Sequence, residues 1–151
     1  MLDRSFSGIT LTKEPIRETD ARVSIYTREF GKITALAQGC QKTTSRLSAH
    51  LEPGRLIRGR IIEKSRMRIV DAITENSFPE IRKHDTGFAR ALAMLASVHT
   101  HTWEFEPDER LWEFCNQSLA LLTAASAHRG ETHFATLDLQ INKRLQEVLG
   151  C

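Results

Sequence analysis

The sequence predicts an α+β protein, with an all-β N-terminal half followed by an all-α C-terminal half. Up to about residue 78, short apolar segments alternate with polar residues and are separated by turn formers, which is typical of strands. Beyond Pro79 the apolar residues recur at steps of three and four, which is typical of amphipathic helices. We therefore expect two domains, residues 1–78 and 79–151.

Five short strands are expected in the N-terminal half. They are bounded by residues that favour turns, among them Gly31, Gly39 and the pair Pro53-Gly54. The expected strands are residues 6–13, 21–28, 32–37, 55–63 and 67–74. Five strands of this length fit a small closed or partly open barrel, for which the five-stranded OB-fold is the common nucleic-acid-binding solution. An SH3-like barrel or another small all-β unit also fits the pattern.

About three helices are expected in the C-terminal half. Asp85 or Thr86 is available as the N-cap of the first helix, and the second follows Pro107, a favourable residue at a helix start. Gly130 is a natural stop for the second helix. The apolar faces of the three helices are, in order, Phe88, Ala91, Leu92, Leu95 and Val98; Leu111, Phe114, Cys115, Leu119 and Leu122; and Phe134, Leu137, Ile141, Leu145 and Val148.

The composition excludes several classes of protein. No stretch approaches the roughly 20 apolar residues that span a bilayer, and the N-terminus lacks the apolar core of a secretion signal, so we expect a cytoplasmic protein without membrane contact. Three cysteines, Cys40, Cys115 and Cys151, have neither the number nor the spacing of a disulfide framework or a zinc site. Cys115 lies on an apolar helix face and is expected in the core.

No catalytic constellation is present in the sequence. Gly31-Lys32 lacks the preceding spaced glycine of a phosphate-binding loop, and no further ligands accompany the pair His99 and His101 at the spacing that a metal site requires. We therefore expect no enzyme activity, no catalytic residue, no metal and no cofactor.

The charge is distributed unevenly along the chain. Residues 1–75 carry 14 Lys and Arg against 9 Asp and Glu, a net charge of +5, whereas residues 76–151 carry 7 against 10, a net charge of −3. A basic half indicates an anionic partner, although a difference of this size also arises by chance on protein surfaces.

The candidate binding residues are cations of the β half. Residues 42–46, Lys-Thr-Thr-Ser-Arg, form a basic and hydroxyl-rich loop suited to phosphate oxygens. Strand alternation places Arg58 and Arg60 on one face, and Lys32 lies at the preceding hairpin. We predict a track for a sugar-phosphate backbone, with Lys32, Lys42, Arg46, Arg58 and Arg60 as its DNA-binding residues. The alternative is an ordinary solvated loop and strand faces that carry charge for solubility.

The order of residues resembles the bacterial recombination mediator family RecO. The similarity rests on segments whose order and spacing agree with the family, namely residues 8–11, 18–20, 25–27, 31–33, 37–39, 45–47 and 51–53. It is strong to about residue 82 and looser through the helices. Family members are usually longer, and many carry a four-cysteine zinc module that this chain lacks, so zinc is not expected.

The resemblance implies an N-terminal OB-fold joined to a helical domain, in a non-enzymatic protein associated with the nucleoid. It implies binding of single- and double-stranded DNA, annealing of complementary strands, and work with RecR and the single-stranded-DNA-binding protein to load RecA at gaps. At matching positions, Lys32, Lys42 and Arg46 would face DNA. The alternative function is a non-catalytic protein-interaction adaptor whose barrel has lost DNA binding.

Overall fold

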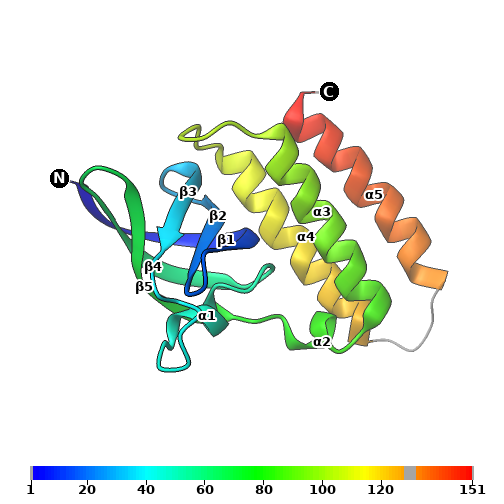
Figure 1. Ribbon diagram of the computed structural model, residues 1–151. Coiled ribbons are helices and arrows are strands. Elements are labelled where there is room, and N and C mark those ends of the chain that lie inside the picture. Colours follow the sequence, from blue (N-terminus) through cyan, green and yellow to red (C-terminus); the bar gives the residue numbers. More distant parts are fainter. Residues whose placement is uncertain (1, 128–131, 151) are drawn as a thin grey trace. The chain divides into compact units, whose positions relative to one another are not determined.

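The computed structural model describes residues 2–127 and 132–150. The chain forms two compact units, Met1–Ser77 with Trp103–Pro107, and Phe78–Thr102 with Asp108–Cys151 (Figure 1). The first unit contains the strands and the second contains the long helices, which confirms the predicted α+β class. The segment Trp103–Pro107 belongs to the first unit although it lies between two helices in the sequence.

The strands of the first unit form a closed barrel in the order β1-β2-β3-β5-β4. All pairs of neighbours are antiparallel except β3 and β5, which meet in parallel where Leu36 lies opposite Arg68. This order and the short helix α1 between β3 and β4 are those of an OB-fold, so the OB-fold prediction is confirmed and the SH3-like alternative is wrong. The strands are β1 (Leu2–Ile16), β2 (Asp20–Thr27), β3 (Gly31–Ala37), β4 (Leu56–Glu63) and β5 (Met67–Asn76), and α1 is Leu47–His50.

The barrel core follows from the alternation of the strands. In β4, Ile57, Gly59 and Ile61 are buried while Arg58 and Arg60 are exposed, as the sequence predicts. Gly59 lies against the ring of Phe6, because a Cβ at this position would stand 2.6 Å from Phe6 Cζ. The core is lined by Phe6, Ala21, Val23, Ile25, Ile33, Ala35, Ala37, Cys40, Leu51, Ile57, Ile61, Met67, Ile69 and Ala72.

The second unit consists of helices whose apolar faces pack together. Its helices are the short α2 (Pro79–Arg82) and the long α3 (Asp85–His101), α4 (Glu109–Ala127) and α5 (Thr132–Leu149). The three long helices confirm the prediction, and their faces are buried or half-buried; Cys115 is fully buried, as expected. No helix of the described residues is long and apolar enough to cross a membrane.

Two details of the helix ends concern the sequence predictions. The N-cap of α3 is His84 and not Asp85 or Thr86, because the His84 imidazole accepts a hydrogen bond from the Gly87 backbone N–H at 3.1 Å. The histidine nitrogen accepts the hydrogen bond that a Ser, Thr or Asp side chain usually accepts at an N-cap. The predicted stop at Gly130 lies outside the described residues.

Candidate nucleic-acid interface

The loop between β3 and α1, residues 38–46, projects from the barrel beside α1 (Figure 1). Its first residues are fixed to the turn between β1 and β2. The Gly39 N–H donates to Asp20 Oδ1 at 2.7 Å, and the Gln41 N–H donates to the Thr19 carbonyl at 2.9 Å. Between these bonds, Cys40 is fully buried in the barrel core. The start of the loop is therefore held by polar contacts and by an apolar anchor.

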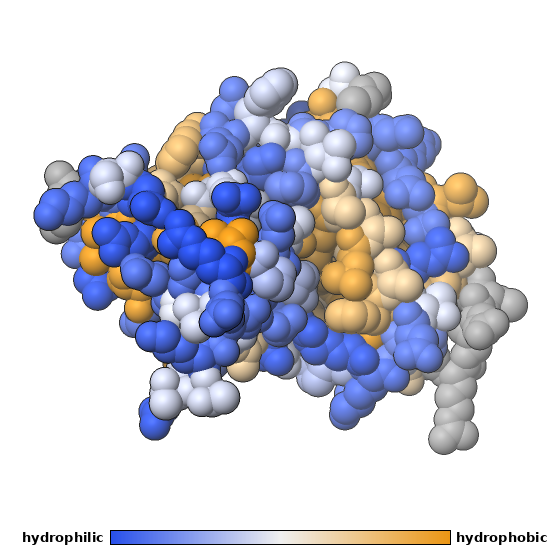
Figure 2. Space-filling view, viewed as in Figure 1, coloured by the Kyte–Doolittle hydropathy of each residue, from blue (hydrophilic) through white to orange (hydrophobic). Residues whose placement is uncertain are grey.

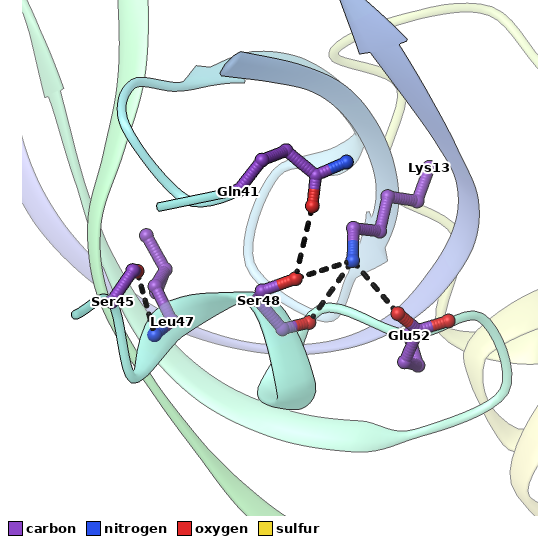
Figure 3. A network of polar contacts seen from close by, with 6 residues as sticks. All are labelled: Lys13, Gln41, Ser45, Leu47, Ser48 and Glu52. Atoms are coloured by element: carbon purple, nitrogen blue, oxygen red, sulfur yellow. Dashed lines mark hydrogen bonds and ion pairs between the residues drawn. The ribbon is translucent and has the colours of Figure 1, made fainter. Parts of the chain in front are cut away.

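Lys13 of β1 fixes the far end of the loop (Figure 3). Its ammonium donates to the Ser48 Oγ at 2.8 Å, to the Ser48 carbonyl at 3.2 Å and to Glu52 Oε1 at 2.7 Å. The Lys13 side chain is only 9% exposed, so these bonds replace the hydrogen bonds to water that the ammonium loses on burial. The Ser48 hydroxyl in turn donates to Gln41 Oε1 at 3.3 Å, which joins both ends of the loop.

Local hydrogen bonds also shape the segment between the two anchors. The Lys42 N–H donates to the Gly39 carbonyl at 3.2 Å, the Ser45 N–H donates to the Lys42 carbonyl at 2.9 Å, and the Leu47 N–H donates to Ser45 Oγ at 3.2 Å. Lys42 and Arg46 are exposed, and neither side chain forms an ion pair with any residue that the structure describes. The loop thus presents two unneutralised cations.

Arg58 and Arg60 are exposed on the outer face of β4, but both are paired with carboxylates. Arg58 Nε lies 2.8 Å from Glu75 Oε1, and Arg60 lies 3.2 Å from Asp3 Oδ2. Exposed pairs of this kind contribute little to stability. The two arginines present less net positive charge than Lys42 and Arg46.

A contact of α1 links the loop to the neighbourhood of Arg58. His50 Nδ1 accepts a hydrogen bond from the Thr74 N–H at 3.0 Å and lies 2.8 Å from its hydroxyl. Thr74 precedes Glu75, the partner of Arg58, in β5. The helix that ends the loop is therefore bonded to the strand that carries this carboxylate.

Lys32 is placed differently from the other four candidates. It is only 8% exposed, and its backbone carbonyl accepts a hydrogen bond from the Phe105 N–H at 3.0 Å. The structure thus groups Lys42 with Arg46 on the loop and Arg58 with Arg60 on β4, whereas Lys32 lies apart at a covered position.

In the view of Figure 2, the surface of the barrel unit is largely hydrophilic and is broken by small apolar patches.

Sequence reasoning missed the residues that hold the loop. Lys13 and Ser48 lie 35 positions apart and Lys13 and Glu52 lie 39 apart, so no local pattern joins them.

Burial raises the pKa of the neighbouring Cys40 thiol, an effect that the Lys13 ammonium opposes. Among the described residues, no group of three or more His, Cys, Asp or Glu side chains is placed to hold a metal ion.

These observations define a class of protein, an OB-fold barrel with an exposed, braced cationic loop, followed by a helical unit. The family model described as "Recombination protein O N terminal" matches residues 1–76. The chain therefore belongs to the RecO family.

Individual relatives agree with this assignment. The DNA repair protein RecO of Myxococcus xanthus is 30% identical over 134 residues, which cover 87% of this chain and 54% of that protein. The DNA repair protein RecO of Rubrobacter xylanophilus is 27% identical over 148 residues, which cover 95% of this chain and 56% of that protein. That of Nostoc punctiforme is 33% identical over 126 residues, covering 80% and 40% of the two chains. The chain spans about half the length of the curated relatives it matches.

Proposed function

We propose that this protein acts in DNA repair as a non-enzymatic recombination mediator that binds DNA through residues 42–46. The observation that carries the proposal is the braced loop. Its residues Lys42 and Arg46 are exposed to solvent and have no carboxylate partners among the described residues. Membership of the RecO family and the similarity to DNA repair proteins RecO support the same role. Arg58 and Arg60 would serve as a secondary site.

The proposed chemistry is neutralisation of phosphate charge. Lysine and arginine release condensed counterions when they contact phosphates, and this contribution is independent of base sequence. Both single- and double-stranded DNA are therefore expected ligands. Shielding the phosphates of two complementary strands would let them approach and anneal without nucleotide hydrolysis. We leave Lys32 out of the primary contact set because its side chain is buried.

The further steps that we propose are cooperation with RecR and with the single-stranded-DNA-binding protein, and through them the loading of RecA onto gaps. These follow from the family and from the expected affinity for DNA, which would also keep the protein with the nucleoid. A protein-interaction adaptor without DNA binding is the competing function.

The test is the binding of a labelled, mixed-sequence single-stranded oligonucleotide, followed by fluorescence anisotropy across a salt series. We would compare the unaltered chain with the double variant Lys42→Ala/Arg46→Ala. The control is Lys83→Ala/Lys143→Ala, which removes two exposed cations from the helical unit. Each double variant lowers the formal net charge from +2 to 0, so overall charge is matched.

We expect the loop variant to weaken binding to all sequences alike. Loss of two phosphate contacts should reduce the slope of log affinity against log salt by about 1.4, since each single-strand contact contributes roughly 0.7. The control variant should keep its slope. An unchanged slope in the loop variant would reject the assignment of the site, and no binding even at low salt would favour the adaptor.

A further inference from the structure

The segment Trp103–Pro107, which we call the aromatic strap, is attached to the β2–β3 hairpin of the barrel unit. Glu104 forms a parallel bridge with Lys32, and the Phe105 N–H donates to the Lys32 carbonyl at 3.0 Å. Gly31 lies so close that a Cβ on it would stand 2.5 Å from the carbonyl carbon of Glu106. Backbone contacts therefore fix the strap against the hairpin.

The strap exposes two large aromatic side chains. Trp103 is 76% exposed and Phe105 is 52% exposed. Phe105 also has a φ of +60°, a conformation that residues other than glycine rarely adopt. Exposed aromatic rings on a fixed and strained backbone are unfavourable for an isolated protein, and such strain concentrates at binding sites.

The charges on the strap indicate the chemistry of its ligand. Glu104 and Glu106 are exposed, and neither carboxylate is paired with a cation in the part of the chain that the structure describes. Two carboxylates repel phosphate, so the strap is poorly suited to stack nucleic-acid bases. An arginine side chain satisfies both features, because its planar guanidinium stacks on aromatic faces and forms paired hydrogen bonds with carboxylates.

We propose that the aromatic strap docks an arginine-bearing segment of a partner protein. The rings of Trp103 and Phe105 would stack on guanidinium groups, and Glu104 and Glu106 would neutralise them. This surface shares no residue with the loop of residues 42–46, so the proposal does not depend on DNA binding.

The experiment uses the full chain and fluorescein-labelled tetra-arginine and tetra-lysine peptides, with binding followed by anisotropy at moderate salt. The variants are Trp103→Ala/Phe105→Ala and Glu104→Gln/Glu106→Gln. The matched controls are Leu121→Ala/Leu139→Ala and Glu80→Gln/Glu147→Gln, which change exposed residues of the helical unit. Circular dichroism would check that each variant remains folded, as we expect for such exposed positions.

We expect tetra-arginine to bind more tightly than tetra-lysine, because the lysine ammonium is a point charge that cannot form the planar stack. The aromatic variant should lose about tenfold in affinity for tetra-arginine and the carboxylate variant about threefold, while both controls bind as the unaltered chain does. Affinity for single-stranded DNA should be unchanged in Trp103→Ala/Phe105→Ala and in Leu121→Ala/Leu139→Ala. The two carboxylate variants both raise the formal net charge from +2 to +4, so their affinity for DNA should change to the same extent.

Three results would overturn the proposal. The first is tetra-arginine binding that survives in the aromatic variant. The second is equal binding of the two peptides, together with weaker binding in the control Glu80→Gln/Glu147→Gln. This result would indicate nonspecific charge attraction. The third is a loss of single-stranded DNA binding in the aromatic variant, which would make the strap a base-stacking platform. The DNA binding of Lys42→Ala/Arg46→Ala tests the loop alone, and neither result for that variant bears on the proposal for the strap.

Discussion

Replacing Lys13 by methionine should loosen the cationic loop without altering its surface. Methionine has a similar length but donates no hydrogen bond, so the variant loses the two bonds to Ser48 and the ion pair with Glu52. A net hydrogen bond from a charged donor contributes roughly 1.5–3 kcal/mol when it is well buried. Because Glu52 is 47% exposed and regains water, its pair contributes only about 0–1 kcal/mol.

Methionine avoids the cost of burying a charge, which offsets much of the loss of these bonds. We therefore expect Lys13→Met to lower the free energy of unfolding by about 2 kcal/mol in total, measured by urea denaturation with circular dichroism. Amide hydrogen exchange should accelerate between residues 39 and 51, since this network joins both ends of the loop. DNA affinity should fall about fivefold, because a looser loop must be ordered on binding.

The control for this prediction is Lys64→Met, which changes an exposed lysine in the β4–β5 turn. A double-mutant cycle of Lys13→Met with Glu52→Gln should give a coupling of about 0.5–1 kcal/mol. A Lys13→Met variant that unfolds within about 0.5 kcal/mol of the unaltered chain and keeps its loop amides equally protected would contradict a bracing role for Lys13.

Two further predictions concern buried residues. Gly59→Ala should lower the free energy of unfolding by about 1–3 kcal/mol in urea titrations, because its Cβ would stand 2.6 Å from Phe6 and 2.9 Å from the Asp71 carbonyl; an unchanged midpoint would contradict this packing. Burial raises the pKa of Cys115 from 9.0 to about 12, so the folded chain keeps a proton that the unfolded chain releases. The resulting stability is fully present below about pH 9 and should fall by about 1.4 kcal/mol per pH unit between 9 and 12. Cys115→Ala should remove this component of the pH dependence, and parallel pH profiles for the two proteins would argue against it.

The fold was accessible from the sequence because its signals are local. Alternation in β4, with Arg58 and Arg60 outward and Ile57 inward, requires only the period of two of a strand. Steps of three and four likewise mark the apolar faces of the helices. The N-cap of α3 was missed because His84 is an unusual capping residue.

The candidate site could be predicted only in part from the sequence, because the rest depends on contacts between residues that are distant in the sequence. Composition predicted Lys42 and Arg46 as binding residues, because basic and hydroxyl residues follow Gly39. It carried no sign that Lys13 braces the loop from another strand. The burial of Lys32 depends on its position against residues 103–107, which lie about 70 positions further along the chain.

In the proposed DNA-binding site, the bracing of the loop would compensate for the small number of cations. A flexible loop would lose conformational entropy on every encounter with DNA, and two phosphate contacts offset little of that loss. Here the Lys13 network and the burial of Cys40 have already restricted the loop in the folded protein. The same reasoning applies to the aromatic strap, which backbone bonds fix against the hairpin before any partner arrives. Because the loop is cationic and the strap is acidic, their ligands should have opposite charge, so DNA and an arginine-bearing segment would not compete for either surface.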